Sequence, residues 1–257
     1  MQNGLIGHTG FVGGNLAVQK RFDEFYNSRN IEQIAGRQFD LLVCSGVRAE
    51  KWIANANPEQ DRKGILRLMQ ALETVQARQL VLISTVDVHQ HPLLVDEDTP
   101  LELVETAPAY GKNRLELEQF VRERFNALVI RLPGLFGPGI KKNIIYDFLH
   151  GNQTDKIHSE SVFQFYDLTR LWSDIEICRR AELQLVHFAT EPVSVAEVAR
   201  QGFGFNFSNA PVGKPARYDF RTKHASLFGG AEGYLFGRDE LFRRLQMFVR
   251  TQTQRAA

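Results

Sequence analysis

A glycine-rich turn near the beginning of the chain constrains the fold more than any other feature. The apolar segment Asn3–Ile6 is predicted to be a strand, and Gly7, Gly10 and Gly13 follow it directly, before a stretch with helical spacing of apolar residues. Glycines at this spacing allow a tight turn and let a pyrophosphate approach the backbone at the helix N-terminus. We therefore predict a dinucleotide-binding unit, the alternative being an ordinary glycine-bearing turn.

Three further apolar runs extend this unit into a larger sheet. Asp40–Cys44, Leu80–Ile83 and Leu128–Ile130 are unbroken, which is typical of strands buried on both faces of a parallel sheet. The stretches between them have helical spacing, with Pro58 at a predicted helix start. This alternation predicts an α/β fold with a Rossmann-type doubly wound parallel sheet.

The pattern loosens after the last of these runs, which divides the chain. We predict a dinucleotide-binding Rossmann domain over residues 1–134 and a small C-terminal substrate lobe formed mainly by residues 135–257. Residues 183–201 contain an apolar run and are expected to return to the Rossmann sheet.

Composition and charge exclude several classes of function. The 31 Lys and Arg residues nearly balance 30 Asp and Glu, which gives a net charge of +1 and no field that would attract nucleic acid or an anionic membrane. No apolar run approaches the roughly 20 residues that a membrane span needs. Cys44 and Cys178 lie far apart, so the sequence predicts neither a metal site nor a disulfide framework. We expect a cytoplasmic protein.

The turn after the second predicted strand bears on the choice of cofactor. Folds that prefer NAD place an acidic residue there to bind the adenosine ribose, whereas this chain has Ser28 and Arg29. A guanidinium pairs with a 2′-phosphate, which a carboxylate would repel. The sequence therefore favours NADP(H) over NAD(H), the alternative being that Arg29 is a solvated loop cation.

Thr85 ends a predicted strand and Tyr110 begins a predicted helix. Together with the glycine turn, the segment Arg131–Pro138 and the segment Phe188–Ser194, they resemble the extended short-chain dehydrogenase/reductase family, particularly its nucleotide-sugar epimerases, dehydratases and reductases. The resemblance covers nearly the whole chain. It implies NAD(P)-dependent hydride transfer, with pairing of two copies through the Tyr110 helix as a possible assembly.

The resemblance also implies roles for individual residues. Thr85 would hold the reacting oxygen, Tyr110 would transfer the proton, and Arg114 stands where the family has a lysine that acidifies the tyrosine. An arginine supplies a cation on the same helix face but is not a neutral replacement, and Lys112 should point away from Tyr110. The implied cofactor-binding residues are Gly7, Thr9, Gly10, Phe11, Val12, Gly13, Ser28, Arg29, Cys44, Ser45, Gly46, Tyr110, Arg114 and Pro133.

The reaction type and the substrate are less constrained. The dehydratases have an Asp–Glu pair after the threonine, where this chain has Val86 and Asp87, so Asp87 is either a single catalytic acid or base or a loop residue that caps backbone groups. This favours a reductase or an epimerase that acts on a sugar nucleotide. Alternatives are a reductase of a small non-sugar carbonyl compound and a catalytically weak NADP-binding regulatory protein. Candidate substrate residues, each also compatible with an ordinary surface or packing role, are Lys141, Lys142, Gln164, Tyr166 and Arg221.

Overall fold

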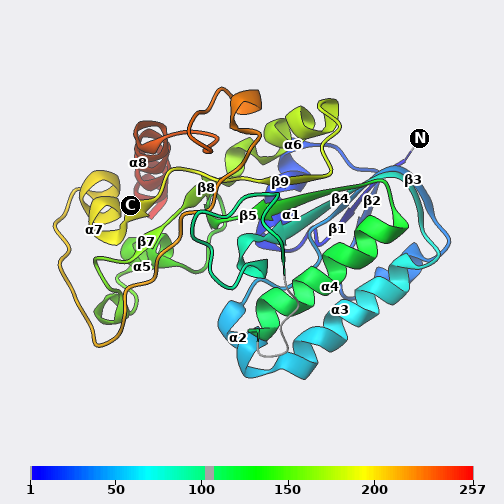
Figure 1. The fold of residues 1–257 in the computed structure, drawn as a ribbon, viewed down its shortest axis with the longest axis horizontal. Helices are drawn as coiled ribbons and strands as arrows, with labels where there is room; N and C mark the ends of the chain where they lie inside the picture. Colours follow the sequence, from blue (N-terminus) through cyan, green and yellow to red (C-terminus); the bar gives the residue numbers. More distant parts are fainter. Residues whose placement is uncertain (1, 102–106, 257) are drawn as a thin grey trace. The chain divides into compact units, whose positions relative to one another are not determined.

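The computed structural model describes residues 2–101 and 107–256, and it confirms the predicted fold class. Six strands form one sheet in the order β2-β1-β3-β4-β5-β9, and β1 pairs in parallel with β2 and β3, as β3 does with β4 (Figure 1). The strands are β1 (Asn3–Ile6), β2 (Glu24–Tyr26), β3 (Gln38–Cys44), β4 (Gln76–Thr85), β5 (Ala127–Leu132) and β9 (Leu185–His187).

The sheet has fewer strands on the β2 side than the Rossmann order has. The strand order reverses direction at β1, with β2 on one side and β3 on the other, so the crevice that binds ligands in such sheets lies at the carboxyl ends of β1 and β3. The Rossmann order 3-2-1-4-5-6 has two strands beyond β1. This chain has one, because only a short 3₁₀ turn, η1 (Ile31–Ile34), lies between β2 and β3.

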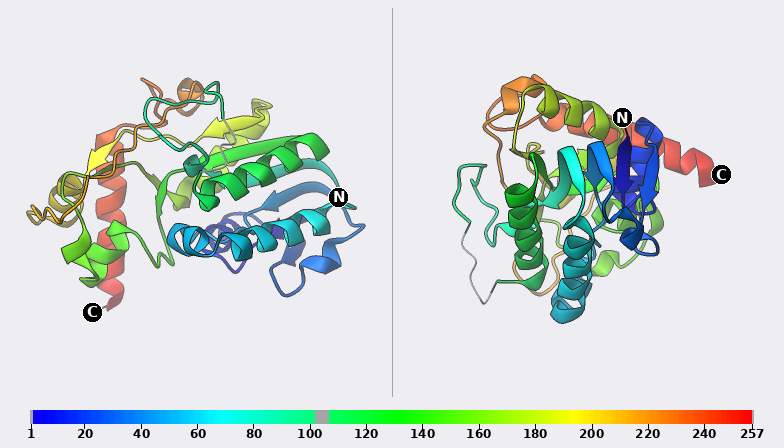
Figure 2. Two further views of the ribbon diagram at one scale, coloured as in Figure 1. Left: turned by 60° about the horizontal axis from the view of Figure 1, so that its bottom comes forward. Right: turned by 90° about the vertical axis from the view of Figure 1, so that its right-hand side faces the viewer.

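Helices cover both faces of the sheet. In Figures 1 and 2, α3 (Pro58–Leu72) and α4 (Ala109–Arg124) lie side by side on one face, while α1 (Phe11–Gln19) contacts α6 (Leu171–Arg180) on the other. The apolar stripe of α3 is buried against the strands, as its spacing predicts. The sequence analysis missed the short helix α2 (Lys51–Ala56), which directly precedes α3.

The chain forms two compact units. Unit 1 comprises residues 1–90, 98–131 and 171–186 and contains nearly all of the sheet; unit 2 comprises residues 91–97, 132–170 and 187–257. This division differs from the predicted boundaries, because α6 and most of β9 belong with the sheet, whereas the rest of the predicted returning segment belongs with unit 2.

Apart from the C-terminal helix, unit 2 is built from short elements. Strands β6 (Gly134–Phe136) and β8 (Phe165–Asp167) are parallel, and β7 (Val162–Phe163) is antiparallel to β10 (Val193–Ser194). The capping box predicted at Ser194 is present at the start of α7 (Val195–Glu197), and the helix continues as a π-helix, η5 (Val198–Phe203). The remaining helices of this unit include α5 (Ile144–His150) and α8 (Arg238–Ala256). Within residues 2–101 and 107–256, no helix is both long and apolar enough to cross a membrane.

Candidate active site

The three glycines of the first turn differ in what they contact. A Cβ on Gly7, whose φ is +88°, would lie 2.4 Å from the Ser45 carbonyl oxygen, and a Cβ on Gly13 would lie 2.1 Å from the Gly7 carbonyl oxygen. These two glycines are therefore required by the packing of the chain itself. Gly10 is exposed, has an ordinary φ of −82° and would bring its Cβ near only one atom, the Gly7 carbonyl oxygen at 3.3 Å. Only at Gly10 does the absence of a side chain leave space for a ligand.

The same turn begins α1. This helix has no acidic residue in its first turn and no side chain that caps its N-terminus among the described residues. Its first backbone N–H groups and the positive end of its dipole therefore remain available to an anion. Thr9 is exposed beside Gly10, and Phe11 and Val12 open the helix and are half-buried.

The segment that follows β3 lies against this turn. Ser45 donates hydrogen bonds to the Ile6 carbonyl from its backbone N (3.0 Å) and from its Oγ (2.9 Å), and Gly46 is exposed next to it. The Cys44 side chain is fully buried, and burial raises the pKa of its thiol to about 11. A cofactor contact from Cys44 would have to come from its backbone.

The turn after β2 is closed by its own polar groups. Asn27 and Asn30 hold it through hydrogen bonds, which include one from the Arg29 backbone N to Asn27 Oδ1 at 2.8 Å. Ser28 and Arg29 are exposed, and the Arg29 guanidinium has no hydrogen-bond or ion-pair partner within the described ranges. Arg37, by contrast, is paired with Glu24 at 2.7 Å. Arg29 is thus the cation of this turn that remains available to a phosphate.

Tyr110 is the second residue of α4 and is buried, with 7% of its surface exposed. Its backbone N donates to Asn55 Oδ1 at 2.9 Å, and its hydroxyl lies close enough to the Thr85 side chain for Thr85 to lower the pKa of the phenol. Burial raises the pKa of Tyr110, an effect that the nearby Asp87 reinforces and that Arg114 and Lys51 oppose. The structure therefore brings together the two residues predicted to handle the reacting oxygen and its proton.

Arg114 lies on the face of the Tyr110 ring. Its guanidinium carbon is 3.8 Å from the ring centroid, and its Nη1 and Nη2 donate to the two carboxylate oxygens of Asp61 at 2.7 and 3.0 Å. Further hydrogen bonds reach the carbonyls of Tyr110 and Arg48. Arg114 is therefore a cation beside Tyr110, as predicted, but its charge is paired with Asp61, which the sequence analysis did not identify.

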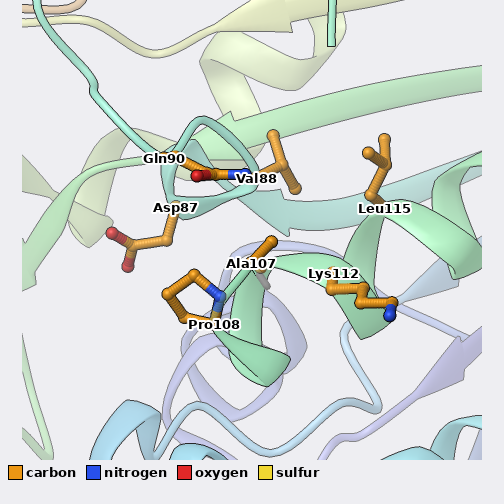
Figure 3. Close-up of a pocket in the computed structure, with 8 residues that line it drawn as sticks. Asp87, Val88, Gln90, Ala107, Pro108, Lys112 and Leu115 are labelled. Carbon is orange, nitrogen blue, oxygen red and sulfur yellow. The ribbon is translucent and has the colours of Figure 1, made fainter. Parts of the chain in front are cut away.

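Asp87 acts on the Tyr110 phenol through its negative charge, and a second cation, Lys51, lies beside it. Lys51 Nζ is 2.7 Å from Asp87 Oδ1, and Asp87 Oδ2 is 3.5 Å from Thr85 Oγ1. The Asp87 backbone N also donates to Thr85 Oγ1 at 3.2 Å, so Thr85 caps the 3₁₀ turn Val86–Val88. The catalytic role and the capping role considered for the Asp87 carboxylate both remain predictions. Asp87 and Lys112 both line a small cavity of about 10 Å³. The Lys112 side chain is directed away from Asp87 (Figure 3).

A second buried ion pair holds α4 against the sheet. Arg131 Nη2 on β5 lies 2.7 Å from Glu118 Oε2 on α4, with both side chains at most 2% exposed. Ser84 at the end of β4 donates to Glu118 as well, and His89 contacts Arg131. This network fixes the helix that carries Tyr110, and the sequence analysis named no member of it as a site residue.

The predicted substrate residues and Pro133 belong to unit 2. Lys141 and Lys142 are exposed, and Arg221 is half-buried beside Asp219 at 3.4 Å. The Gln164 amide is buried and binds the Thr190 and Phe220 backbones, and Tyr166 is fully buried among aromatic rings. These placements favour a packing role for Gln164 and Tyr166, and the substrate contacts of all five residues remain predictions.

Three solved structures illustrate what the chain is similar to. The UDP-glucose 4-epimerase of Thermotoga maritima, solved with UDP-glucose, has a TM-score of 0.73 at 15% identity, with 100% of both chains covered. MoeE5 in complex with UDP-glucuronic acid and NAD has a TM-score of 0.74 at 15% identity, again with 100% of both chains covered. The dTDP-4-dehydrorhamnose reductase of Bacillus anthracis, in complex with NADP, has a TM-score of 0.71 at 17% identity, covering 96% of this chain and 97% of the reductase.

These similarities confirm the predicted resemblance to the extended short-chain dehydrogenase/reductases at the level of the fold. No protein-family model matches the chain, and no curated protein does. Within residues 2–101 and 107–256, no group of three or more His, Cys, Asp or Glu side chains is arranged to hold a metal ion.

Proposed function

We propose that this protein is an NAD(P)-dependent reductase or epimerase that acts on a nucleotide-linked sugar. The observation that carries the proposal is the placement of the buried Tyr110 phenol near the Thr85 side chain at the carboxyl end of β4, the edge of the sheet at which the glycine turn also lies. The sugar nucleotide is proposed because the similar structures were solved with UDP-glucose and UDP-glucuronic acid.

The residues of unit 1 fit a dinucleotide. The open space at Gly10 and the uncapped N-terminus of α1 suit a pyrophosphate, and Ser45 and Gly46 line the same crevice. Arg29 would bind a 2′-phosphate. When bound, the nicotinamide group supplies or accepts the hydride.

Tyr110 and Thr85 would manage the proton of the sugar oxygen. Because burial raises the pKa of Tyr110, the phenol keeps its proton at neutral pH, which suits a donor to the oxygen of a carbonyl that is being reduced. Thr85 would hold that oxygen within reach of the phenol.

The decisive test is turnover with a panel of sugar nucleotides and small carbonyl compounds, comparing the unmodified protein with Tyr110→Phe. We expect turnover with a sugar nucleotide and a loss of about 10²–10⁴-fold in Tyr110→Phe, with unchanged cofactor affinity. Turnover with small carbonyl compounds alone would favour a non-sugar reductase. Cofactor binding without turnover in any form would favour a regulatory protein.

Cofactor preference is tested separately by fluorescence titration. We propose NADP(H) over NAD(H), because the Arg29 guanidinium is exposed and without a partner among the described residues. A charge-assisted phosphate contact contributes roughly 1.5–3 kcal/mol, so NADPH should bind about tenfold or more tightly than NADH. Arg29→Ala should remove most of this difference, whereas Arg37→Ala, at an arginine already paired with Glu24, should leave it. Equal affinities in the unmodified protein would contradict the proposal.

A further inference from the structure

Two cations lie near Tyr110, and they differ in what their donors already bind. The donors of Arg114 are directed to the Asp61 carboxylate and to two backbone carbonyls, and only 5% of its side chain is exposed. Lys51 extends from α2, its ammonium contacts Asp87, and 45% of its side chain is exposed. Lys51 thus contacts the carboxylate that acts on the phenol, whereas Arg114 covers the tyrosine ring.

A continuous set of polar contacts joins Lys51 to the phenol. The ammonium is 2.7 Å from Asp87 Oδ1, the other carboxylate oxygen is 3.5 Å from Thr85 Oγ1, and the Thr85 side chain acts on the ionisation of the Tyr110 hydroxyl. Asp87 also donates its backbone N–H to Thr85, which fixes the loop around that hydroxyl. A change at Lys51 therefore reaches Tyr110 through two side chains.

We infer that Lys51 is a positioning residue of this site, which holds the Asp87 carboxylate beside Thr85 and offsets the negative charge that Asp87 places near Tyr110. This inference rests on the proposed role of Tyr110 in proton transfer. Without Lys51, the Asp87 carboxylate would act on the phenol without the ammonium that offsets its charge.

The sign of the effect follows from the charges around the phenol. Arg114 on α4 and Lys51 on α2 favour the phenolate, Asp87 after β4 disfavours it, and Asp61 on α3 faces Arg114 rather than the hydroxyl. Removing the Lys51 charge should raise the pKa of Tyr110, and removing the Asp87 charge should lower it. Opposite shifts from the two partners of one ion pair would not arise from a general loosening of the loop.

The experiment places 3-fluorotyrosine at position 110 of the full chain and follows its ionisation by ¹⁹F NMR, without cofactor or substrate. We expect the titration to move to higher pH in Lys51→Met, to lower pH in Asp87→Asn, and to an intermediate position in the double variant. The matched control is Lys112→Met, which removes a lysine that lines the same cavity but is directed away from Asp87 (Figure 3). It should leave the titration unchanged.

Two results would overturn the inference: an unchanged titration in Lys51→Met, or an equal shift in Lys112→Met. Since the NMR measurement needs no turnover, its outcome is independent of whether hydride transfer is found. Where turnover is measured, the pH profile of the oxidative direction, which requires the phenolate, should move to higher pH in Lys51→Met. Lack of turnover in every form would contradict the proposed function, but it would not contradict the effect of Lys51 on the ionisation of Tyr110.

Discussion

The two ion pairs beside Tyr110 differ in how far water reaches them. In the pair of Arg114 with Asp61, the side chains are 5% and 9% exposed, whereas in the pair of Lys51 with Asp87 they are 45% and 18% exposed. Removing one partner of a buried pair leaves an uncompensated charge away from water, but an exposed pair is screened and contributes little to folding. We therefore expect the buried pair to act mainly on the stability of the α3–α4 face, and the exposed pair to act mainly on the ionisation of the phenol.

The largest expected effect comes from breaking the buried pair. Arg114→Met should lower the free energy of unfolding by roughly 3–5 kcal/mol, because Asp61 stays buried without its cation. The measurement is urea denaturation followed by circular dichroism. The matched control is Arg62→Met, which breaks the exposed Arg62–Glu116 pair between the same two helices and should cost no more than about 1 kcal/mol. Equal losses in the two variants would remove the distinction between buried and exposed pairs.

A smaller effect is expected when the charge is kept and the geometry is changed. Arg114→Lys retains a cation for Asp61 but loses the two-point contact and the hydrogen bonds to backbone carbonyls. We expect a loss of about 1.5–3 kcal/mol in the free energy of unfolding, measured by the same denaturation. Hydride transfer should be largely kept because a positive charge remains beside Tyr110. A lysine variant as unstable as Arg114→Met would show that geometry, not charge, dominates this contact.

Breaking the exposed pair should change the free energy of unfolding much less. Lys51→Met should change the free energy of unfolding by less than about 1 kcal/mol, because both partners remain accessible to water. Thermal unfolding monitored by calorimetry would detect a larger role. A stability loss comparable to that of Arg114→Met would show that the Lys51–Asp87 pair is a structural contact, and the comparison between the two sides of Tyr110 would fail.

The smallest effect concerns ionic strength. The Debye length falls from about 10 Å at 0.1 M salt to about 3 Å at 1 M, and accessible charges are screened more than buried ones. Added salt should therefore diminish the difference in Tyr110 titration between the unmodified protein and Lys51→Met. The stability difference between the unmodified protein and Arg114→Met should change much less. Equal sensitivity to salt would indicate that the two pairs have similar access to solvent.

Local sequence patterns predicted the features of the molecule that depend on residues close together in the sequence. The glycine turn and the Ser194 capping box each depend on residues a few positions apart, so their sequence spacing carried the information. Thr85 and Tyr110 were predicted from the resemblance to a known family, to which their positions at the end of a strand and the start of a helix contributed, and the structure places their side chains near each other.

Lys51 and Asp61 were missed for a physical reason. Lys51 pairs with a residue 36 positions away, and Asp61 with one 53 positions away, so no periodicity connects either partner to the other. The helix that carries Lys51 is only six residues long, which is too short to give a periodic signal. A carboxylate at the start of an otherwise amphipathic helix was the only sign of Asp61, and such residues are ordinary first-turn acids. The strand order was not predicted either, because it depends on which strands pair and not on their positions in the sequence.

The short edge strands of the sheet have a consequence for association between chains. Edge strands carry unpaired N–H and C=O groups that can recruit a strand from another molecule, and proteins limit this by keeping such strands short and charged. Both edges here, β2 and β9, are three residues long, and the β2 edge carries the Glu24–Arg37 pair beside the exposed Phe25. On the β2 side, the absence of a further strand leaves a short edge strand exposed, and on the other side the sheet also ends in a short strand. Short edge strands make edge-to-edge aggregation unfavourable.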